Sequence, residues 1–406
     1  MRWYGVNSVR IRGSEKNMPI TLLPPLIFGD TDNDLGGHLL AGAETIFLPP
    51  SPTNEYATLI GDYRALRDHA IGGDDNLAGG SFTIGTGPRI IGDAITIADG
   101  ARGGNDTIHG GLVYGDAIDL IGHGQGGNDT IFAFARGPSA YGDADTITDH
   151  ARGGDDVMSG SGRFPSLYGD AGTIAGHGRG GDDVVFAGGD AATACGDAGM
   201  MSGFSAGGND TVEADSLFFS AAYGDAVTMT DHAQGGDDIV SGASGIATPS
   251  YGDARLYGDA QSLSGFSVGG DDTLHATGLA APGPGTSTTM YGDGVELLDH
   301  AKGGNDRLIS GLGNDQMWGD AAVVAPTAQT GADTFAFSPS NGLDTINDFQ
   351  PGKDHIELDG FGFNNFGDVA SHIQDAQNGA LITFDANNSI LVLGVHQLSA
   401  GDFVLA

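Results

Sequence analysis

The sequence has few basic residues, little glutamate and one cysteine. Its 406 residues include 16 Lys and Arg against 53 Asp and Glu, a formal net charge of −37. Nucleic acid is excluded as a partner, because its phosphates would meet no basic face. Only six acidic residues are Glu, a good helix former, whereas 72 Gly and abundant Asp favour turns, which excludes a mostly helical protein. Since Cys195 is alone, no internal disulfide can form.

Long apolar runs are also missing. No stretch approaches the length of a membrane span, so we expect no membrane-spanning segment. The segment before Pro19 lacks the apolar run of about 7–15 residues that an N-terminal secretory signal needs, so we expect none. Apolar residues make up 39% of the chain, below the usual value of about 45–50%, which argues against a single thick core. Acidic residues at this density require either disorder or bound cations.

Internal repeats cover most of the chain. A Gly-Asp dipeptide recurs, with its Asp at Asp30, Asp62, Asp93, Asp116, Asp143, Asp170, Asp197, Asp225, Asp259, Asp293 and Asp320. Thirteen residues after ten of these lies a second acidic anchor, which usually closes a Gly-Gly-(Asn/Asp)-Asp tetrad: Asp75, Asp106, Asp129, Asp156, Asp183, Asp210, Asp238, Asp272, Asp306 and Asp333. In the first copy, Gly-Ala-Glu-Thr at 42–45 replaces the tetrad. The interval from Gly-Asp to the anchor is fixed, whereas the interval from the anchor to the next Gly-Asp varies. This indicates that one half of each repeat is a rigid structural unit and the other half contains a loop that tolerates insertions.

The repeat predicts an all-β fold, a parallel β-roll or β-solenoid. Apolar residues lie two positions after the anchors, as at Ile108 and Met158, and we expect them to face inward on short strands. The position before Gly-Asp is filled by Tyr114, Tyr141, Tyr168, Cys195, Tyr223, Tyr251, Tyr257, Tyr291 and Trp318. We expect these side chains to stack into a ladder. The clearest units are 27 residues long. Two coil geometries remain open: a 27-residue coil, favoured by this ladder, and 18-residue turns, favoured by alternating Asp and Gly at Asp149, Gly176, Gly203, Asp231, Gly265 and Asp299.

The Gly-Asp chemistry points to calcium. Glycines permit tight turns in which carbonyl oxygens converge, and Asp adds a hard, charged oxygen. Calcium takes six to eight such oxygens in flexible geometry. Without a cation, stacked Asp columns would place like charges roughly 5 Å apart, the spacing of strands, which is costly. The alternative is an array of solvated Asp/Gly turns.

Near the end of the repeats, Lys302 to Trp318 reads KGGNDRLISGLGNDQMW, with Asp306 and Asp315 nine residues apart. This stretch resembles the RTX, or haemolysin-type, calcium-binding repeat family, whose nonapeptide is G-G-x-G-x-D-x-U-x. The resemblance implies a parallel β-roll in which the sixth-position Asp and loop carbonyls hold calcium between turns. The implied ligands are Asp75, Asp106, Asp129, Asp156, Asp183, Asp210, Asp238, Asp272, Asp306, Asp315 and Asp333, with Gly104, Gly127, Gly154, Gly181, Gly208, Gly236, Gly270, Gly304 and Gly313. Gly-Asp residues such as Asp143 are out of register with the nonapeptide and are either ligands or turn formers.

Six histidines share one slot: His69, His123, His150, His177, His232 and His300. Imidazoles can bind zinc or copper, but Gly100, Phe204 and Phe266 occupy the same slot. A metal-ligand position would not be expected to accept Phe. We therefore expect a structural ladder here.

The character of the chain changes at Gly331, where GADTFAFSPSNGLDTINDF leads to a hairpin-like ALITFDANNSILVLGV. This segment resembles the C-terminal domain of RTX proteins, including serralysin-type metalloproteases. The resemblance implies a small β-rich cap that carries a type I secretion signal, and hence a protein secreted to the cell exterior. We expect an N-terminal lead-in at 1–27, calcium-binding solenoid repeats at 28–330 and the cap at 331–406.

The resemblance does not extend to the protease activity of the serralysin-type proteins. The sequence contains no His-Glu-x-x-His, no Gly-x-Ser-x-Gly, no Walker loop and no dinucleotide fingerprint, so we expect no enzyme. The leading hypothesis is a secreted calcium-binding solenoid that folds on calcium outside the cell and acts as a structural or surface-interaction protein. Its expected partners are calcium, the type I secretion machinery, and surface polysaccharide or other cells. The alternatives are a polysaccharide lyase or hydrolase on a solenoid face, and an ice-binding or adhesin module.

Overall fold

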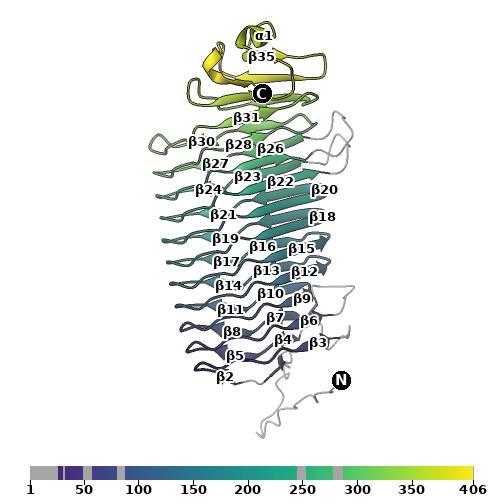
Figure 1. Ribbon diagram of the computed structural model, residues 1–406, viewed down its shortest axis with the longest axis vertical. Coiled ribbons are helices and arrows are strands. Elements are labelled where there is room, and N and C mark those ends of the chain that lie inside the picture. Colours follow the sequence, from purple (N-terminus) through teal and green to yellow (C-terminus); the bar gives the residue numbers. More distant parts are fainter. Residues whose placement is uncertain are drawn as a thin grey trace, which may run out of the picture.

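The computed structural model describes residues 26–30, 33–48, 57–79, 87–244, 253–277 and 287–405. Within these ranges the chain is nearly all β and winds into a parallel β-solenoid whose coils stack along one axis (Figure 1). The predicted all-β solenoid is therefore confirmed. The expected lead-in at 1–27 lies outside the described residues, except for its last two positions, which belong to β1 (Leu26–Phe28).

The coils contribute strands to three parallel ladders. The first ladder contains β1, β4 (Thr58–Ile60), β7 (Arg89–Ile91), β10 (Leu112–Tyr114), β13 (Ser139–Tyr141), β16 (Ser166–Tyr168), β23 (Asp253–Tyr257), β26 (Ser287–Tyr291), β29 (Gln316–Trp318), β32 (Leu343–Ile346) and β36 (Ser389–Leu393). The second contains β3 (Thr45–Leu48), β6 (Asn76–Gly79), β9 (Thr107–Gly110), β12 (Thr130–Ala135), β15 (Val157–Gly162), β22 (Ile239–Ser244), β25 (Thr273–Ala276), β28 (Arg307–Ile309), β31 (Thr334–Phe337), β33 (His355–Leu358) and β37 (Phe403–Leu405). The long strands β18 (Val184–Cys195) and β20 (Thr211–Tyr223) run through both of these ladders and join them into one sheet.

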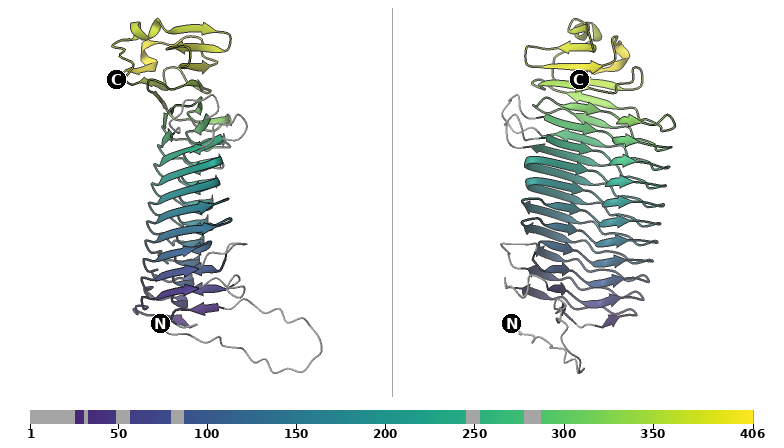
Figure 2. Two further views of the ribbon diagram at one scale, coloured as in Figure 1. Left: turned by 90° about the vertical axis from the view of Figure 1, so that its right-hand side faces the viewer. Right: turned by 180° about the vertical axis from the view of Figure 1, so that it is seen from behind.

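The third ladder is a separate sheet. It contains β2 (Asp34–Leu35), β5 (Tyr63–Leu66), β8 (Ala94–Ile97), β11 (Ala117–Leu120), β14 (Ala144–Ile147), β17 (Ala171–Ile174), β19 (Ala198–Met201), β21 (Ala226–Met229), β24 (Ala260–Leu263), β27 (Gly294–Leu297) and β30 (Ala321–Val324). Parallel pairing continues past Gly331, since β31 pairs with both β28 and β33. At that end of the stack (Figure 2), β34 (Ile373–Ala376), β35 (Gly379–Thr383) and β36 pair antiparallel, and the expected hairpin is β35–β36. The helical elements described there are α1 (Phe366–Ala370) and the 3₁₀ turn η1 (Ala400–Asp402).

Each coil is one whole repeat unit, so the 27-residue geometry is the one adopted. Tyr141 pairs with Tyr168, and Thr146 pairs with Thr173. The alternating Asp and Gly, which had favoured 18-residue turns, has a local cause. This slot is left-handed, with φ of 63° at Asp149 and 71° at Gly176. Gly adopts that conformation freely and Asp tolerates it better than most residues do.

Two apolar cores run along the stack. The larger lies between the first two ladders and includes the residues predicted to face inward, all at most 1% exposed: Ile108, Ile131, Met158, Val185, Val212, Leu274 and Leu308. The smaller lies behind the third ladder and is built from residues such as Ala144, Ile147 and Ala151. Two thin cores account for the low apolar content better than one thick core.

The slot before Gly-Asp forms the predicted aromatic ladder. Ring centroids of successive members stack 4.9 Å apart between Tyr114 and Tyr141, and 4.8 Å apart between Tyr291 and Trp318. Tyr251 lies outside the described residues. Cys195 pairs with Tyr168 on one side and Tyr223 on the other, and its side chain is fully buried. It is therefore a small member of the ladder.

We expect the Cys195 thiol to be inert in the folded chain. Burial raises the pKa of this thiol, because the interior disfavours the thiolate that reacts. A thiol-specific alkylating reagent should modify the folded protein on the order of 10²-fold more slowly than the urea-unfolded protein, roughly the opening cost of a local unfolding of about 3 kcal/mol. Equal rates of modification in the two states, followed by mass spectrometry, would show that this coil is not packed as described.

The histidine slot is a stacked ladder on an outer turn. The ring centroids of His150 and His177 are 4.9 Å apart, and Phe204 continues the stack with 5.3 Å to His177 and 4.6 Å to His232. Face-to-face rings do not converge on a common ion. Within the described ranges, no group of three metal-ligating side chains includes one of these histidines. The expected structural ladder agrees with this arrangement.

Candidate metal centre

In each coil the chain crosses between the two cores twice. In the clearest coil, Gly142–Asp143 leads from β13 to β14, and 153–156 leads back to β15. Strands β13 and β15 border the larger core, whereas β14 borders the smaller one. The two crossings therefore face each other across the coil. The constant interval of thirteen residues is the length of chain that rounds the smaller core.

The anchors form a column of buried carboxylates at one crossing. This anchor column contains Asp75, Asp106, Asp129, Asp156, Asp183, Asp210, Asp238, Asp272, Asp306 and Asp333, each at most 3% exposed. One oxygen of each ties neighbouring coils together: the Asp156 N–H donates to Asp183 Oδ1 at 2.7 Å, and the Asp129 N–H donates to Asp156 Oδ1 at 2.6 Å. The other oxygen, Oδ2, is buried without a hydrogen-bond partner among the described residues in all ten.

The Gly-Asp aspartates form a second column, the Gly-Asp column, at the opposite crossing. Its members Asp62, Asp93, Asp116, Asp143, Asp170, Asp197, Asp225, Asp259, Asp293 and Asp320 are at most 1% exposed. One oxygen accepts from a backbone N–H eleven residues on, as Gly154 N–H donates to Asp143 Oδ1 at 2.9 Å. A buried oxygen is left without a partner in the described structure at Asp62, Asp143, Asp170, Asp197, Asp225, Asp259 and Asp293. These buried, unpartnered oxygens distinguish the Gly-Asp aspartates from solvated turn residues.

The predicted glycines hold the Gly-Asp column through their N–H groups. Those donors are Gly104, Gly127, Gly154, Gly181, Gly208, Gly236, Gly270 and Gly304, each bonded to the Asp eleven residues earlier. A carbonyl close to an anchor belongs to another glycine. A Cβ on Gly142 would overlap both Gly169 O of the next coil and Asp156 Oδ2. Sequence reasoning missed this Gly169-type carbonyl, which precedes the Asp in Gly-Asp.

Asp315 and Gly313 lie apart from both columns. Asp315 follows β28 and accepts from the Thr288 N–H at 3.0 Å and from the Gly311 N–H at 3.0 Å. Its own N–H donates to Asp344 Oδ1 at 2.8 Å. Both oxygens of Asp315 therefore have protein donors, in contrast to the anchors. The nonapeptide spacing that paired Asp315 with Asp306 does not place the two in one column.

Burial makes the charged form of these carboxylates costly. It is the largest cause that raises the pKa of Asp156, and the neighbouring anchor Asp129 adds repulsion. Burial likewise raises the pKa of Asp143, with repulsion from Asp156 across the coil as the next cause. Near the N-terminal end, burial raises the pKa of Asp75 to about 9. A bound proton or a bound cation relieves this cost.

We expect Gly142→Ala to disrupt its coil, because the new methyl would collide with Gly169 O and Asp156 Oδ2. The expected cost in free energy of unfolding is about 1–3 kcal/mol or more. Gly137→Ala is the matched control, since a Cβ there meets no atom within 4 Å, and it should change stability by less than about 0.5 kcal/mol. Urea unfolding in calcium, followed by circular dichroism, measures both. Similar losses in the two variants would contradict the close approach at Gly142.

Comparison with protein-family models, with curated proteins and with solved structures finds no match to this chain. Among the described residues, no helix combines the length and apolar character needed to cross a membrane.

Proposed function

We propose that this chain is a calcium-dependent solenoid of the RTX type, which binds ions between its coils and folds as it does so. The observation that carries the proposal is the pair of facing columns whose buried carboxylate oxygens lack protein donors. Unpartnered buried charge is among the most destabilising features a fold can contain. A chain that repeats it in coil after coil requires a counterion wherever these carboxyl groups are ionised.

The donor set suits calcium. Around the clearest coil, Asp156 offers a carboxylate oxygen at one crossing. At the other crossing, Gly169 offers a carbonyl oxygen near Asp156, and Asp143 and Asp170 offer carboxylates. When bound, calcium supplies two positive charges to hard oxygen ligands in flexible geometry. The ligands available here are carboxylates and carbonyls, without thiols or imidazoles, which argues against zinc or copper.

The same charge and calcium dependence bear on where the protein folds and what it does there. A chain with this net charge and little apolar burial stays loose at low calcium, and extracellular calcium modules typically have a Kd of about 10⁻⁴ to 10⁻³ M. We propose secretion in the loose state, through the C-terminal segment, followed by folding outside the cell. The folded rod would then serve as a structural or surface-interaction protein. The direct test is the number of calcium ions per chain after equilibrium dialysis against millimolar calcium, measured by atomic emission as the excess over the buffer: several ions are expected, and a value near zero would overturn the proposal.

Adjacent aspartates of one tetrad provide an internal control. Asp156→Asn should lower the free energy of unfolding in saturating calcium by about 3–5 kcal/mol, since removing one charge from a buried ionic group leaves its partner uncompensated. Asp155 is exposed, so Asp155→Asn should change it by less than about 0.5 kcal/mol. The measurement is urea unfolding at fixed calcium. If both variants lost the same stability, the buried anchor would have no special role.

A further inference from the structure

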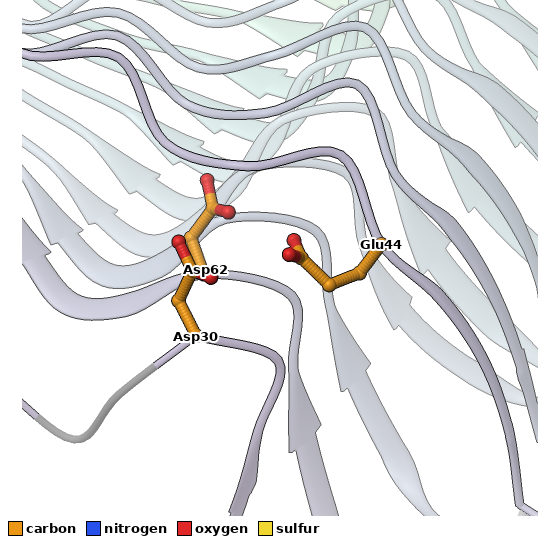
Figure 3. A group of neighbouring side chains, drawn as sticks. All are labelled: Asp30, Glu44 and Asp62. Atoms are coloured by element: carbon orange, nitrogen blue, oxygen red, sulfur yellow. The ribbon is translucent and has the colours of Figure 1, made fainter. Parts of the chain in front are cut away.

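Three acidic side chains meet at the N-terminal end of the two columns (Figure 3). Asp30 follows β1, Glu44 precedes β3, and Asp62 follows β4. A carboxylate oxygen from each lies within 4.8 Å of the others. Within the described ranges, one group of three metal-ligating side chains has this property, and this is that group. It includes Glu44, which replaces the anchor Asp in the first copy of the repeat.

Position in the stack explains why Glu44 differs from the other anchors. Its N–H donates to Asp75 Oδ1 at 2.6 Å, as every later anchor N–H does to the next coil. In the described structure no coil precedes the coil of Glu44, so the Glu44 carboxylate accepts no hydrogen bond from the N–H of a preceding anchor. Its Oε2 is buried without a partner among the described residues.

Asp62 brings a second unpartnered carboxylate oxygen to the group. Its side chain is fully buried, and its Oδ2 accepts from the Gly73 N–H at 2.7 Å. Its Oδ1 is buried and has no partner in the described part of the chain. Gly42 leaves room beside the group: a Cβ there would stand 2.6 Å from Glu44 Oε1 and 3.4 Å from Asp30 Oδ1. The group therefore has unpartnered oxygens and a glycine that leaves space next to them.

The opposite end of the columns is closed by protein donors instead. Gln350 Nε2 donates to Asp320 Oδ2 at 2.6 Å, and the Gln350 N–H donates to Asp354 Oδ2 at 2.7 Å. Lys353 Nζ lies 3.1 Å from Gln350 Oε1 and brings a positive charge to this end. The last carboxylates at the two ends of the columns therefore have different neighbours. The C-terminal end has an amide and an ammonium, whereas the N-terminal end has a third acid.

We propose that Asp30, Glu44 and Asp62 bind a divalent cation that closes the N-terminal end of the columns. This inference rests on the proposed function for its choice of calcium. It goes further in assigning a separate site with three side-chain carboxylates, in place of carboxylates mixed with carbonyls. Because Asp30 and Glu44 are partly exposed, this ion exchanges with solvent more readily than ions between coils.

The test uses the full chain, folded in calcium and passed through gel filtration in a buffer of fixed millimolar calcium, so that bound calcium is measured as the excess over the buffer. Glu44→Gln keeps the shape of the side chain and removes its charge. Wild type and variant are compared by calcium content per chain, and we expect the variant to hold one ion fewer. Glu296→Gln is the matched control, since Glu296 is an exposed glutamate on β27, and it should keep the wild-type content.

Terbium provides a second readout at this end of the molecule. Tyr63 begins β5, and after burial, a hydrogen bond with Asp30 is the next cause that raises the pKa of its hydroxyl. Tyr63 is thus placed to sensitise the luminescence of terbium bound at this site. Glu44→Gln and Tyr63→Phe should each lower the emission, and the double variant should lower it no further than Glu44→Gln alone, because both changes act on one ion.

The outcomes separate this site from the proposed function. If the wild type binds no calcium, the proposed function fails. If the wild type binds calcium and Glu44→Gln keeps both the full ion content and the full emission, the terminal site fails by itself. Circular dichroism checks that the variant folds. Should it lose strand signal, Asp30→Asn repeats the comparison, and an undiminished ion content in that variant overturns the site.

Discussion

Removal of calcium from the folded protein is expected to abolish most of its strand signal. At calcium tenfold above Kd, each site contributes about 1.4 kcal/mol to folding, by mass action on the folded state alone. Several such sites together reach the range of about 5–15 kcal/mol that separates folded from unfolded domains. The opposing force is large, because both columns place carboxylates such as Asp143 and Asp156 in the interior without donors for all their oxygens.

The measurement is far-ultraviolet circular dichroism during titration with a calcium chelator, followed by return of calcium. Magnesium is the control ion. Its preference for strict octahedral geometry and its reluctance to lose water should leave the chain largely unfolded at equal concentration. The Cys195 thiol reports on the same transition, since it is buried in the folded ladder. Equal strand content and an equally protected thiol with and without chelator would overturn calcium-dependent folding.

Acid is expected to restore strand structure to the calcium-free chain. Burial raises the pKa of Asp62 to about 7 and that of Asp75 to about 9 in the folded state, whereas an unfolded Asp has a pKa of about 3.9. A carboxyl group with a raised pKa in the folded state favours folding below its unfolded pKa, where it is protonated in both states. That contribution is lost as pH rises through the folded pKa. Stability of the calcium-free chain should therefore be greatest near pH 4 and disappear between about pH 6 and 9.

Calcium should reverse this dependence. Protons and ions compete for the same oxygens, so calcium affinity rises as the carboxyl groups lose their protons. In millimolar calcium the strand signal should hold at neutral pH, where the calcium-free chain has lost it. The test is strand content from pH 4 to 9 in chelator and in calcium, with sedimentation to exclude aggregation in acid. A flat profile in chelator would contradict protonation of the buried columns.

Much of the fold was determined by the sequence alone, because a solenoid repeats its local rules. The residues two positions after the anchors, such as Ile108 and Met158, were expected to face inward and are fully buried or nearly so. The slots of Tyr141 and His150 were expected to stack, and their rings do. A parallel coil places each slot directly against the same slot of the next coil. Residues that occupy the same position of successive repeats therefore form a column in space.

The tertiary structure decided what lies across the coil. Spacing could not show that Asp143 faces Asp156, since that depends on how thirteen residues round the smaller core. It also could not show that protein donors satisfy Asp315, which the nonapeptide register had grouped with Asp306. Glu44 looked like a degenerate anchor in the sequence, and its meeting with Asp30 and Asp62 follows from its place at an end of the stack. The repeat itself determines the contacts between equivalent positions of neighbouring coils. Contacts across one coil, and at the ends of the stack, depend on how each coil closes, and only the tertiary structure determines this.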